Sequence, residues 1–312
     1  MDTFYDKVKA AELIENLAKE RQSQNPDACY LSEVNLNKEW QKQFDFIQRL
    51  SPAEWRLVFK SSNETVSETV LVLHGAVCRL DLPPVKARVS PKRAMYLRQG
   101  ISITGYGSLT FGRAIEAVSS IYTLFSRDIG ERNMANVECI GMHQGFQSLS
   151  SSNCYLTRRD QADDLAEVLI PPAMDPHRHL EEAAGEKYVY TDDNEIFCYE
   201  RKIMDSGERE FVDISPSKIQ IGDIVEVHMT FMAVPVKDGK KKVISTLRSI
   251  TLLDGNLTEM VIAAKTNLRL QATTAPRKRG VHDGEMMIDT RCKFSCMKIH
   301  EGEEMDSTSL KV

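Results

Sequence analysis

The chain has 312 residues, of which 42% are hydrophobic and 27% charged, and its formal net charge at pH 7 is −5. This composition excludes a disordered chain, and the mild acidity argues against a general coat for nucleic acid or a membrane surface. The first residues lack the layout of a signal peptide, and the longest strongly apolar run, residues 69–78, is too short to span a bilayer. We therefore expect an intracellular protein of the cytoplasm or the nucleus, without a membrane partner.

The N-terminal part of the chain is predicted to be mainly helical. Apolar residues at helical spacing indicate a helix over residues 3–21 that ends before Asn25-Pro26. The same spacing indicates a helix over residues 36–49. Ser51-Pro52-Ala53-Glu54 has the pattern of a capping box with proline at the first helical position, so a further helix is expected up to about Lys60.

Strands and helices alternate in the next part of the chain. A contiguous apolar run predicts a strand over residues 68–82, for which a helix is the alternative, and Pro83-Pro84 ends it. Ser90-Pro91 begins a predicted helix that stops at Gly100, and residues 101–104 form a short strand. A glycine-containing loop then leads into a helix through residues 114–125.

The second half of the chain first becomes acidic and proline-rich and then β-rich. Strands are predicted at residues 187–191, 196–202, 268–273 and 286–298, together with a long hairpin that begins near Ile224. The fold class is therefore α+β, with an N-terminal mostly helical region followed by a β-rich, barrel- or sandwich-like C-terminal domain. The predicted divisions are a mainly helical domain at 1–170, a linker at 171–185, a β-rich domain at 186–300 and a disordered tail at 301–312.

The hairpin in residues 219–255 carries the strongest structural signal in the sequence. Asp238-Gly239 supplies the positive φ angles of a two-residue type I′ turn, which would place Lys237 opposite Lys240. That register puts Val225 opposite Leu252. One face is then a core face, made of Val225, Val227, Met229, Phe231, Ala233, Ile244, Ile250 and Leu252 and interrupted by Thr246 and Arg248. The other face is mixed and suits solvent, another sheet or a ligand.

Two resemblances rest on this hairpin. The segment GDIVEVHMTFMAVPVKDGKKKVISTLRSITLLDG, residues 222–255, resembles a dispersed family of uncharacterised proteins of mushroom-forming fungi, which has no assigned function. The order Gly222-Asp223-x-Val225-x-Val227, a turn with glycine, and Leu247-x-x-Ile250-x-Leu252 is similar to strands of single-stranded-DNA-binding proteins with the oligonucleotide-binding fold. This second resemblance implies that the β-rich domain contacts single-stranded nucleic acid.

Basic residues gather in three segments that could contact phosphates. Residues 79–98 hold six cations against the single acid Asp81, and solvated faces of a helix and a linker are the alternative interpretation. The lysines at the hairpin tip could equally serve to keep the tip soluble and to block edge-to-edge pairing. The candidate nucleic-acid-binding residues are Lys92, Arg93, Lys237, Lys240, Lys241, Lys242, Arg277, Lys278 and Arg279.

Aromatic residues for base stacking are scarce on the hairpin itself. Its mixed face has no Phe, Tyr or Trp, so the candidates are Tyr188, Tyr190, Phe197 and Tyr199 on neighbouring strands. Neither a metal site nor a cofactor is predicted, and the catalytic residues, if any, are unknown. The seven widely spaced cysteines are expected to be free thiols.

These observations favour a non-catalytic binding or assembly protein that contacts single-stranded nucleic acid through the β-rich domain. One alternative is a structural protein of a dispersed genetic element that assembles with itself, so that a homo-oligomer is a second predicted partner. The other alternative is an enzyme whose residues come together from distant parts of the chain.

Overall fold

The structure is a computed structural model in which residues 4–50, 53–60, 66–162, 165–204, 209–236 and 239–274 are described. The helices are α1 (Lys7–Gln24), α2 (Lys38–Gln43), α3 (Leu109–Ile129), α4 (His179–Ala184) and α5 (Asn256–Thr274). The strands are β1 (Cys29–Tyr30), β2 (Phe44–Leu50), β3 (Ala53–Lys60), β4 (Val66–Glu68), β5 (Leu71–Asp81), β6 (Arg98–Thr104), β7 (Ile140–His143), β8 (Phe146–Cys154), β9 (Thr157–Arg158), β10 (Tyr188–Val189), β11 (Phe197–Ile203), β12 (Arg209–Asp213), β13 (Ile224–Pro235) and β14 (Lys241–Asp254). Residues 4–268 belong to one unit, and residues 269–312 are assigned to another.

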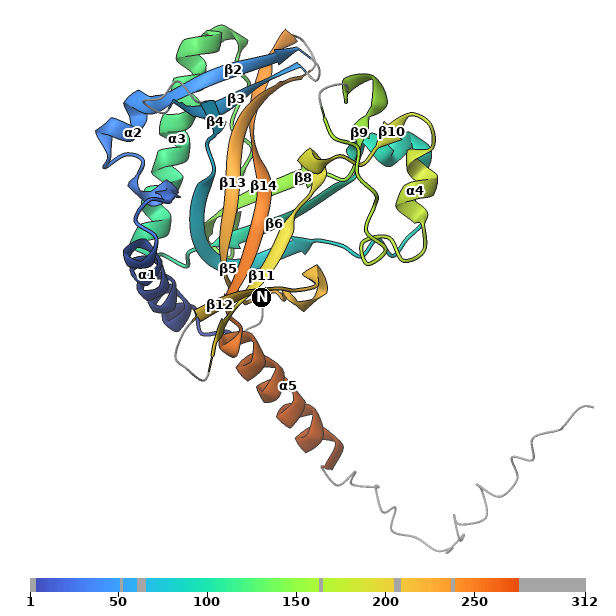
Figure 1. Ribbon diagram of the computed structural model, residues 1–312. Coiled ribbons are helices and arrows are strands. Elements are labelled where there is room, and N and C mark those ends of the chain that lie inside the picture. The colour runs from blue at the N-terminus through green and yellow to red at the C-terminus, as the bar shows by residue number, and fades with distance from the viewer. Residues whose placement is uncertain are drawn as a thin grey trace, which may run out of the picture. The chain divides into compact units, whose positions relative to one another are not determined.

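A curled sheet is the framework of the first unit (Figure 1). Within the described residues it has twelve strands, and its main path is β12-β11-β14-β13-β5-β6-β8-β7. Strand β3 pairs with β13, β2 and β4, while β1 lies parallel to β5. The long hairpin β13–β14 is thus central, because β5, β3 and β11 all pair with one of its two strands.

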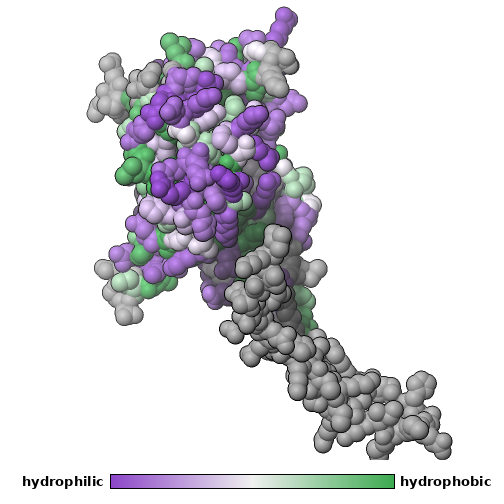
Figure 2. All heavy atoms as spheres, turned by 90° about the vertical axis from the view of Figure 1, so that its right-hand side faces the viewer, coloured by the Kyte–Doolittle hydropathy of each residue, from purple (hydrophilic) through white to green (hydrophobic). Residues whose placement is uncertain are grey.

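Apolar side chains on one face of the curled sheet form the main core with α3. The fully buried Phe125 and Ile121 of α3 pack in the same cluster as Leu73 of β5 and Phe231 of β13. Figure 1 shows α3 along one side of the sheet and a small lobe, residues 155–195 with β9, β10 and α4, on the other side. The lobe has its own apolar cluster, which includes Leu180. The surface on this side of the molecule is mainly hydrophilic (Figure 2).

The hairpin is confirmed, and half of its predicted register is correct. Val225 pairs with Leu252 and Val227 with Ile250, as expected. Between the pairs His228–Ser249 and Met229–Leu247 the register shifts by one residue, which is a β-bulge at Arg248. The turn connection is also one residue longer than predicted, since the Val236 amide donates to the Lys240 carbonyl at 2.8 Å.

The bulge changes which residues face the core. Beyond it, Val243 and Leu247 are buried in the main core, in place of the predicted Ile244 and the polar Thr246 and Arg248. Arg248 is moved to the opposite face, where it donates to Glu68 at 2.6 Å. The shift therefore replaces Thr246 and Arg248 in the core face by the small buried Ser245, which pairs across the strands with Phe231.

The predicted helices at both ends of the N-terminal region are confirmed as α1 and α3. Asp6 caps α1 by accepting from the Lys9 amide at 3.0 Å, and α1 ends at Asn25 as expected. Ser108 caps α3 by accepting from the Phe111 amide at 3.2 Å. The carboxylate of Glu15 in α1 also accepts from the Thr110 amide at 2.7 Å, so α1 is bonded to the first turn of α3.

The prediction of helices over residues 36–60 is wrong except for the short α2. Residues 44–50 and 53–60 form the antiparallel strands β2 and β3. Phe44 and Phe59 are cross-strand partners with ring centroids 6.2 Å apart. Glu54, expected in a capping box, is buried and accepts from Arg56 instead. The apolar residues of this segment are spaced as in a helix, but their packing against neighbouring strands stabilises β2 and β3 instead.

Two further predicted elements differ from the structure. The helix expected over residues 90–100 is only a 3-10 turn, η2 (Pro91–Tyr96), followed by β6. The strand expected at residues 268–273 belongs to α5. The strand predicted at 286–298 and the tail at 301–312 lie outside the described residues.

The α+β class is confirmed, while the mostly helical N-terminal region is only partly so, because six of the sheet strands precede Gly105. Strands from either side of residues 171–185 pair directly, as β5 does with β13. Strand β8 approaches β14, where Ser245 donates to Ser151 at 2.9 Å. A closed barrel stays a prediction. Among the described helices, none is long and apolar enough to cross a membrane.

The buried carboxylate of Glu226 joins α1 to the outer face of the sheet. Arg21, near the end of α1, donates from Nε and Nη2 to its two oxygens at 2.8 and 3.0 Å. His74 of β5 and His228 of β13 approach the same carboxylate with Nε2 at 2.9 and 3.0 Å. Because a carboxylate only accepts hydrogen bonds, each imidazole donates through Nε2.

This set of donors keeps Glu226 ionised. Burial alone would raise the pKa of Glu226, but the hydrogen bonds from His228, His74 and Arg21 outweigh burial and hold the pKa well below its usual range. Without the carboxylate, the Arg21 guanidinium would remain in a mostly buried place without its counter-charge.

We expect Glu226→Gln to lower the free energy of unfolding by about 3–5 kcal/mol, the usual effect of breaking a buried ion pair. Urea denaturation near pH 7 measures it. The matched control is Glu210→Gln on exposed β12, which should change stability by less than about 0.5 kcal/mol. An equal effect of the two substitutions would contradict the structural role of Glu226.

The stability difference between the natural protein and Glu226→Gln should depend on pH. Since the folded-state pKa of Glu226 is depressed, its stabilising contribution is complete above the unfolded-state pKa of about 4.3 and is lost as pH falls further. The stability difference between the natural protein and Glu226→Gln should therefore shrink as pH falls from about 4 to about 3. A difference that stays constant down to pH 3 would contradict the depressed pKa.

Candidate nucleic-acid interface

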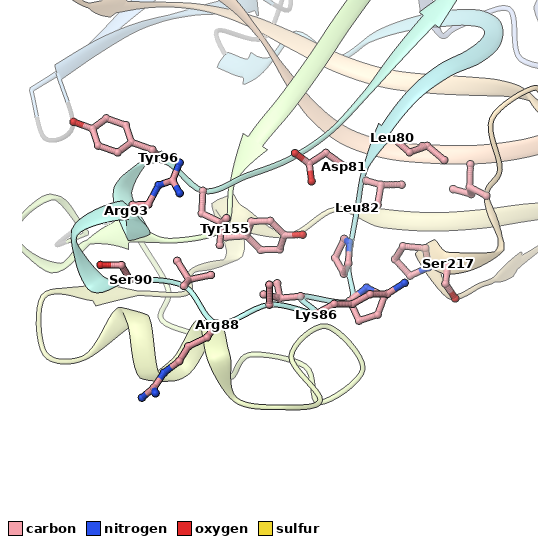
Figure 3. Close-up of a pocket in the computed structure, with 18 residues that line it drawn as sticks. Leu80, Asp81, Leu82, Lys86, Arg88, Ser90, Arg93, Tyr96, Tyr155 and Ser217 are labelled. Atoms are coloured by element: carbon pink, nitrogen blue, oxygen red, sulfur yellow. The ribbon is translucent and has the colours of Figure 1, made fainter. Parts of the chain in front are cut away.

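A groove of about 800 Å³ lies beside the end of β5 (Figure 3). Residues 80–90 and the turn η2 form most of its wall, and Tyr155 of the lobe and residues 216–219 after β12 complete it. Its apolar lining consists of Leu80, Leu82, Pro83, Pro84, Val85, Val89, Leu97 and Ile219. The groove therefore combines an apolar floor with the basic segment that the sequence singled out.

The turn η2 positions the cationic and aromatic side chains at one end of the groove. Pro91 occupies the start of η2, and the fully buried Ala94 packs in the apolar cluster of the lobe. With Ala94 turned inward, Lys92 and Arg93 are exposed and Tyr96 has 71% of its surface accessible. Figure 3 shows Arg93 and Tyr96 next to each other at this end.

The groove is rich in cations that lack an acidic partner. Lys86 and Arg93 line it, and within the part of the chain that the structure describes neither makes an ion pair. Arg88 extends away from the other side chains in Figure 3 and lies 3.4 Å from Glu182 of α4. The predicted residues Lys92 and Arg93 are thus both accessible, but only Arg93 lines the groove.

A smaller hollow of about 230 Å³ continues the basic surface on β6 and β8. Arg79 and Arg98 lie at its edge, and its lining also includes Ser102, Ser150 and Ser152. Arg98 donates to the Ser152 hydroxyl at 3.4 Å. Small hydroxyl side chains between two guanidinium groups leave room for an extended anionic chain and offer it hydrogen bonds.

Asp81 is the acidic residue shared by the groove and the hollow. Its side chain is exposed and, in Figure 3, points toward the same part of the groove as the Tyr155 hydroxyl. Burial, with a smaller contribution from the Asp81 charge, raises the pKa of Tyr155. Tyr155 is therefore a neutral hydrogen-bonding group, and Asp81 is the local source of repulsion for a phosphate.

The lysines at the hairpin tip are used differently from the groove cations. Lys241 lies over the Trp55 ring, with Nζ 4.1 Å from the ring centroid, and Lys242 pairs with Glu138. Lys240 is exposed, while Lys237 lies outside the described residues, as do Arg277, Lys278 and Arg279. The structure does not bring the described tip lysines into the groove.

A second surface, on β11 and β12, carries exposed aromatic rings. Phe197 and Tyr199 are stacked, with centroids 6.5 Å apart and an angle of 18° between the rings. Phe211 of β12 lines the same hollow of about 450 Å³. The sequence pattern predicted Phe197 and Tyr199 but not Phe211, whereas Tyr190 is buried in the lobe. Residues 209–213 read Arg-Glu-Phe-Val-Asp, which does not alternate between polar and apolar residues, so the local pattern carries no strand signal for Phe211.

The described His, Cys, Asp and Glu side chains are the candidates for metal binding, and the cysteine thiols are candidates for nucleophilic chemistry. Among the described residues, no group of three or more His, Cys, Asp or Glu side chains could hold a metal ion. The five described cysteines are free thiols, and Cys292 and Cys296 lie outside this part. Burial raises the pKa of Cys29 and of Cys198 to about 12, so neither thiol is a ready nucleophile.

Comparison with known proteins gives only distant structural similarity. No family model matches the chain, and no curated protein matches it. The chain is similar to gp2.5, a single-stranded DNA binding protein encoded by bacteriophage T7, at 10% identity and a TM-score of 0.36, over 60% of this chain and 87% of that one. It is also similar to the single-stranded DNA-binding protein from bacteriophage Enc34, at 10% identity and a TM-score of 0.30, over 67% and 88% of the two chains. The same phage protein in complex with single-stranded DNA gives a TM-score of 0.32. The resemblance to fungal proteins stays a prediction.

Proposed function

We propose that the protein binds single-stranded nucleic acid, with the phosphates in the basic groove beside β5. The observation that carries this proposal is the grouping of Lys86 and Arg93, without acidic partners in the described chain, around an apolar floor with the exposed ring of Tyr96. Arg79 and Arg98 extend the cationic surface along β6 and β8. Catalysis is not part of the proposal.

The charges favour a polyanion as the ligand. A phosphate chain bound to lysine and arginine releases condensed counterions, which supplies most of the sequence-independent binding energy. The net charge of −5 does not oppose this, because screening limits the reach of each charge to about 8–10 Å at ordinary salt concentrations. The potential at the groove is set by its own cations and by Asp81.

The apolar floor favours a single strand over a duplex. Bases in a duplex are paired and stacked inside, so an apolar groove gains little from them, whereas a single strand exposes its bases to apolar and aromatic side chains. Tyr96 is placed at the edge of the groove where such a base would lie. The expected ligand is therefore an unpaired strand that contacts the protein through both phosphates and bases.

Replacing Lys86 and Arg93 together by Gln should weaken binding of a deoxythymidine oligomer and reduce its salt dependence. With a slope of about −0.7 per phosphate contact, two lost contacts reduce the slope of log K against log salt by about 1.4 and the affinity at 0.1 M salt by roughly 25-fold. Fluorescence anisotropy over a salt series measures both quantities.

The matched control replaces Arg113 and Arg127, two exposed arginines of α3, by Gln. It makes the same change in net charge on a different surface and should leave the slope unchanged. If both double variants lose the same affinity and slope, binding is a general charge effect and the groove is not the site. Absence of any salt-dependent binding by the natural protein would refute the proposed function altogether.

Asp81→Asn should have the opposite effect, because it removes the acid that faces the groove cations. We expect tighter binding. If the loss of the Asp81 charge has the same effect as one additional phosphate contact, the affinity at 0.1 M salt rises by about 5-fold. Since Asp81 is exposed, its replacement should change thermal stability little. Weaker binding by Asp81→Asn in the same anisotropy assay would show that the phosphates lie elsewhere.

A further inference from the structure

Strands β11 and β12 carry two exposed aromatic rings, Phe197 and Phe211, and Phe197 is stacked on the half-buried Tyr199. Phe197 has 51% of its surface accessible and Phe211 has 44%. Phe197 and Tyr199 are two residues apart on one strand and therefore point to the same side, opposite to the buried Cys198 between them. Such rings cost free energy when they face water, so their position suits a ligand with flat apolar faces.

Ion pairs engage the basic residues near the rings. Arg201 and Arg209 both pair with Glu20. Lys202 and Lys218 lie near Glu200, at 3.7 and 3.9 Å, and Lys202 and Glu200 are on the Cys198 side of β11, away from the rings. Asp213 pairs across the strands with Tyr199, so the surface of the rings offers stacking and does not offer an excess of positive charge.

The interior of the same hollow offers polar groups rather than free cations. The Arg21 guanidinium lies 4.9 Å from the Phe211 ring centroid but is committed to Glu226. The polar lining also includes His228, Arg248, Ser249, Thr251, Asp192 and Glu195, and Arg248 is paired with Glu68 and Asp193. Carboxylates there would repel a phosphate and accept hydrogen bonds from N–H groups of bases, such as N3–H of thymine, so the bases are expected inside the hollow and the phosphates away from it.

We infer that the surface of Phe197, Tyr199 and Phe211 is a second site, which stacks unpaired bases of the strand held by the basic groove. This inference rests on the proposed function. The segment after β12 supports this continuity, since Pro216 and Ser217 line the groove only a few residues beyond Phe211. Ring stacking needs exposed base faces, which gives this site the preference for single strands.

The test compares two oligomers with the same phosphates, a deoxythymidine oligomer of about 16 nucleotides and an abasic oligomer of equal length. The natural protein should bind the deoxythymidine oligomer more tightly. Phe197→Leu keeps an apolar side chain but removes the ring, and it should lower affinity for deoxythymidine by about 5- to 100-fold while leaving the abasic oligomer and the salt slope unchanged. Phe197→Tyr should retain the preference.

Variants in the groove separate this inference from the proposed function. Replacing Lys86 and Arg93 by Gln should weaken both oligomers and reduce the salt slope, and Tyr96→Leu should leave part of the preference for bases intact. Far-ultraviolet circular dichroism and thermal unfolding confirm that each variant is folded.

The inference would be overturned in two ways that leave the groove in place. One is a natural protein that binds both oligomers equally; the other is a Phe197→Leu variant that keeps the full preference for deoxythymidine. If Tyr96→Leu alone abolished the preference, the bases would stack in the groove and not on β11. Photocrosslinking with an oligomer that contains 5-iodouracil locates the contact directly, and the expected crosslinks are at Phe197, Tyr199 and Phe211.

Discussion

A single extra residue in β14 determines which side chains of this strand face the core and which face outward. The register shift between His228–Ser249 and Met229–Leu247 lets Ile250 and Leu247 both face the core, although they are three residues apart. A regular strand would have placed one of them outside. The same shift turns Arg248 outward, where it contacts Asp193 of the lobe at 2.9 Å. The core, the lobe and the outer surface therefore depend on one local irregularity.

The two ends of the outer face are held by different charged groups. At one end Glu226 accepts from Arg21 and two histidines and fixes α1. At the other end Arg248 and Arg56 share Asp193; burial opposes the ionised form of Asp193, but these two guanidinium groups outweigh burial and lower its pKa. Buried ion pairs add little net stability compared with an apolar core, yet they fix geometry strongly. We interpret both clusters as devices that position the surfaces between them.

Sequence patterns predicted the parts of this fold that are determined locally. The helix α3 and the hairpin follow from apolar spacing and turn residues, which act over a few residues, although the turn of the hairpin is one residue longer than predicted. Residues 44–60 satisfied a helical pattern as well, and only their partners in β13 and β4 decide for strands. Likewise, Arg21 and Glu226 are 205 positions apart, and no spacing rule connects them. The basic segment was visible in the sequence, whereas its apolar floor and the contribution of Phe211 required the folded chain.

Adding a base-stacking surface to a groove that holds the phosphates has a physical advantage for a protein of negative net charge. Cations are effective only where acids are few, and the segment of residues 79–98 meets this condition with Asp81 as its one acid. Aromatic stacking is insensitive to salt and tolerates carboxylates nearby, so Phe197 and Phe211 can lie in a hollow that also contains Asp192 and Glu195. Nucleic acid bound to both surfaces would gain salt-dependent affinity from the basic groove. The surface of Phe197, Tyr199 and Phe211 would add a preference for single strands that does not weaken with salt. As the salt concentration increases, the total affinity should fall, and stacking should supply a larger share of the binding energy. The preference for single strands over duplex should then rise.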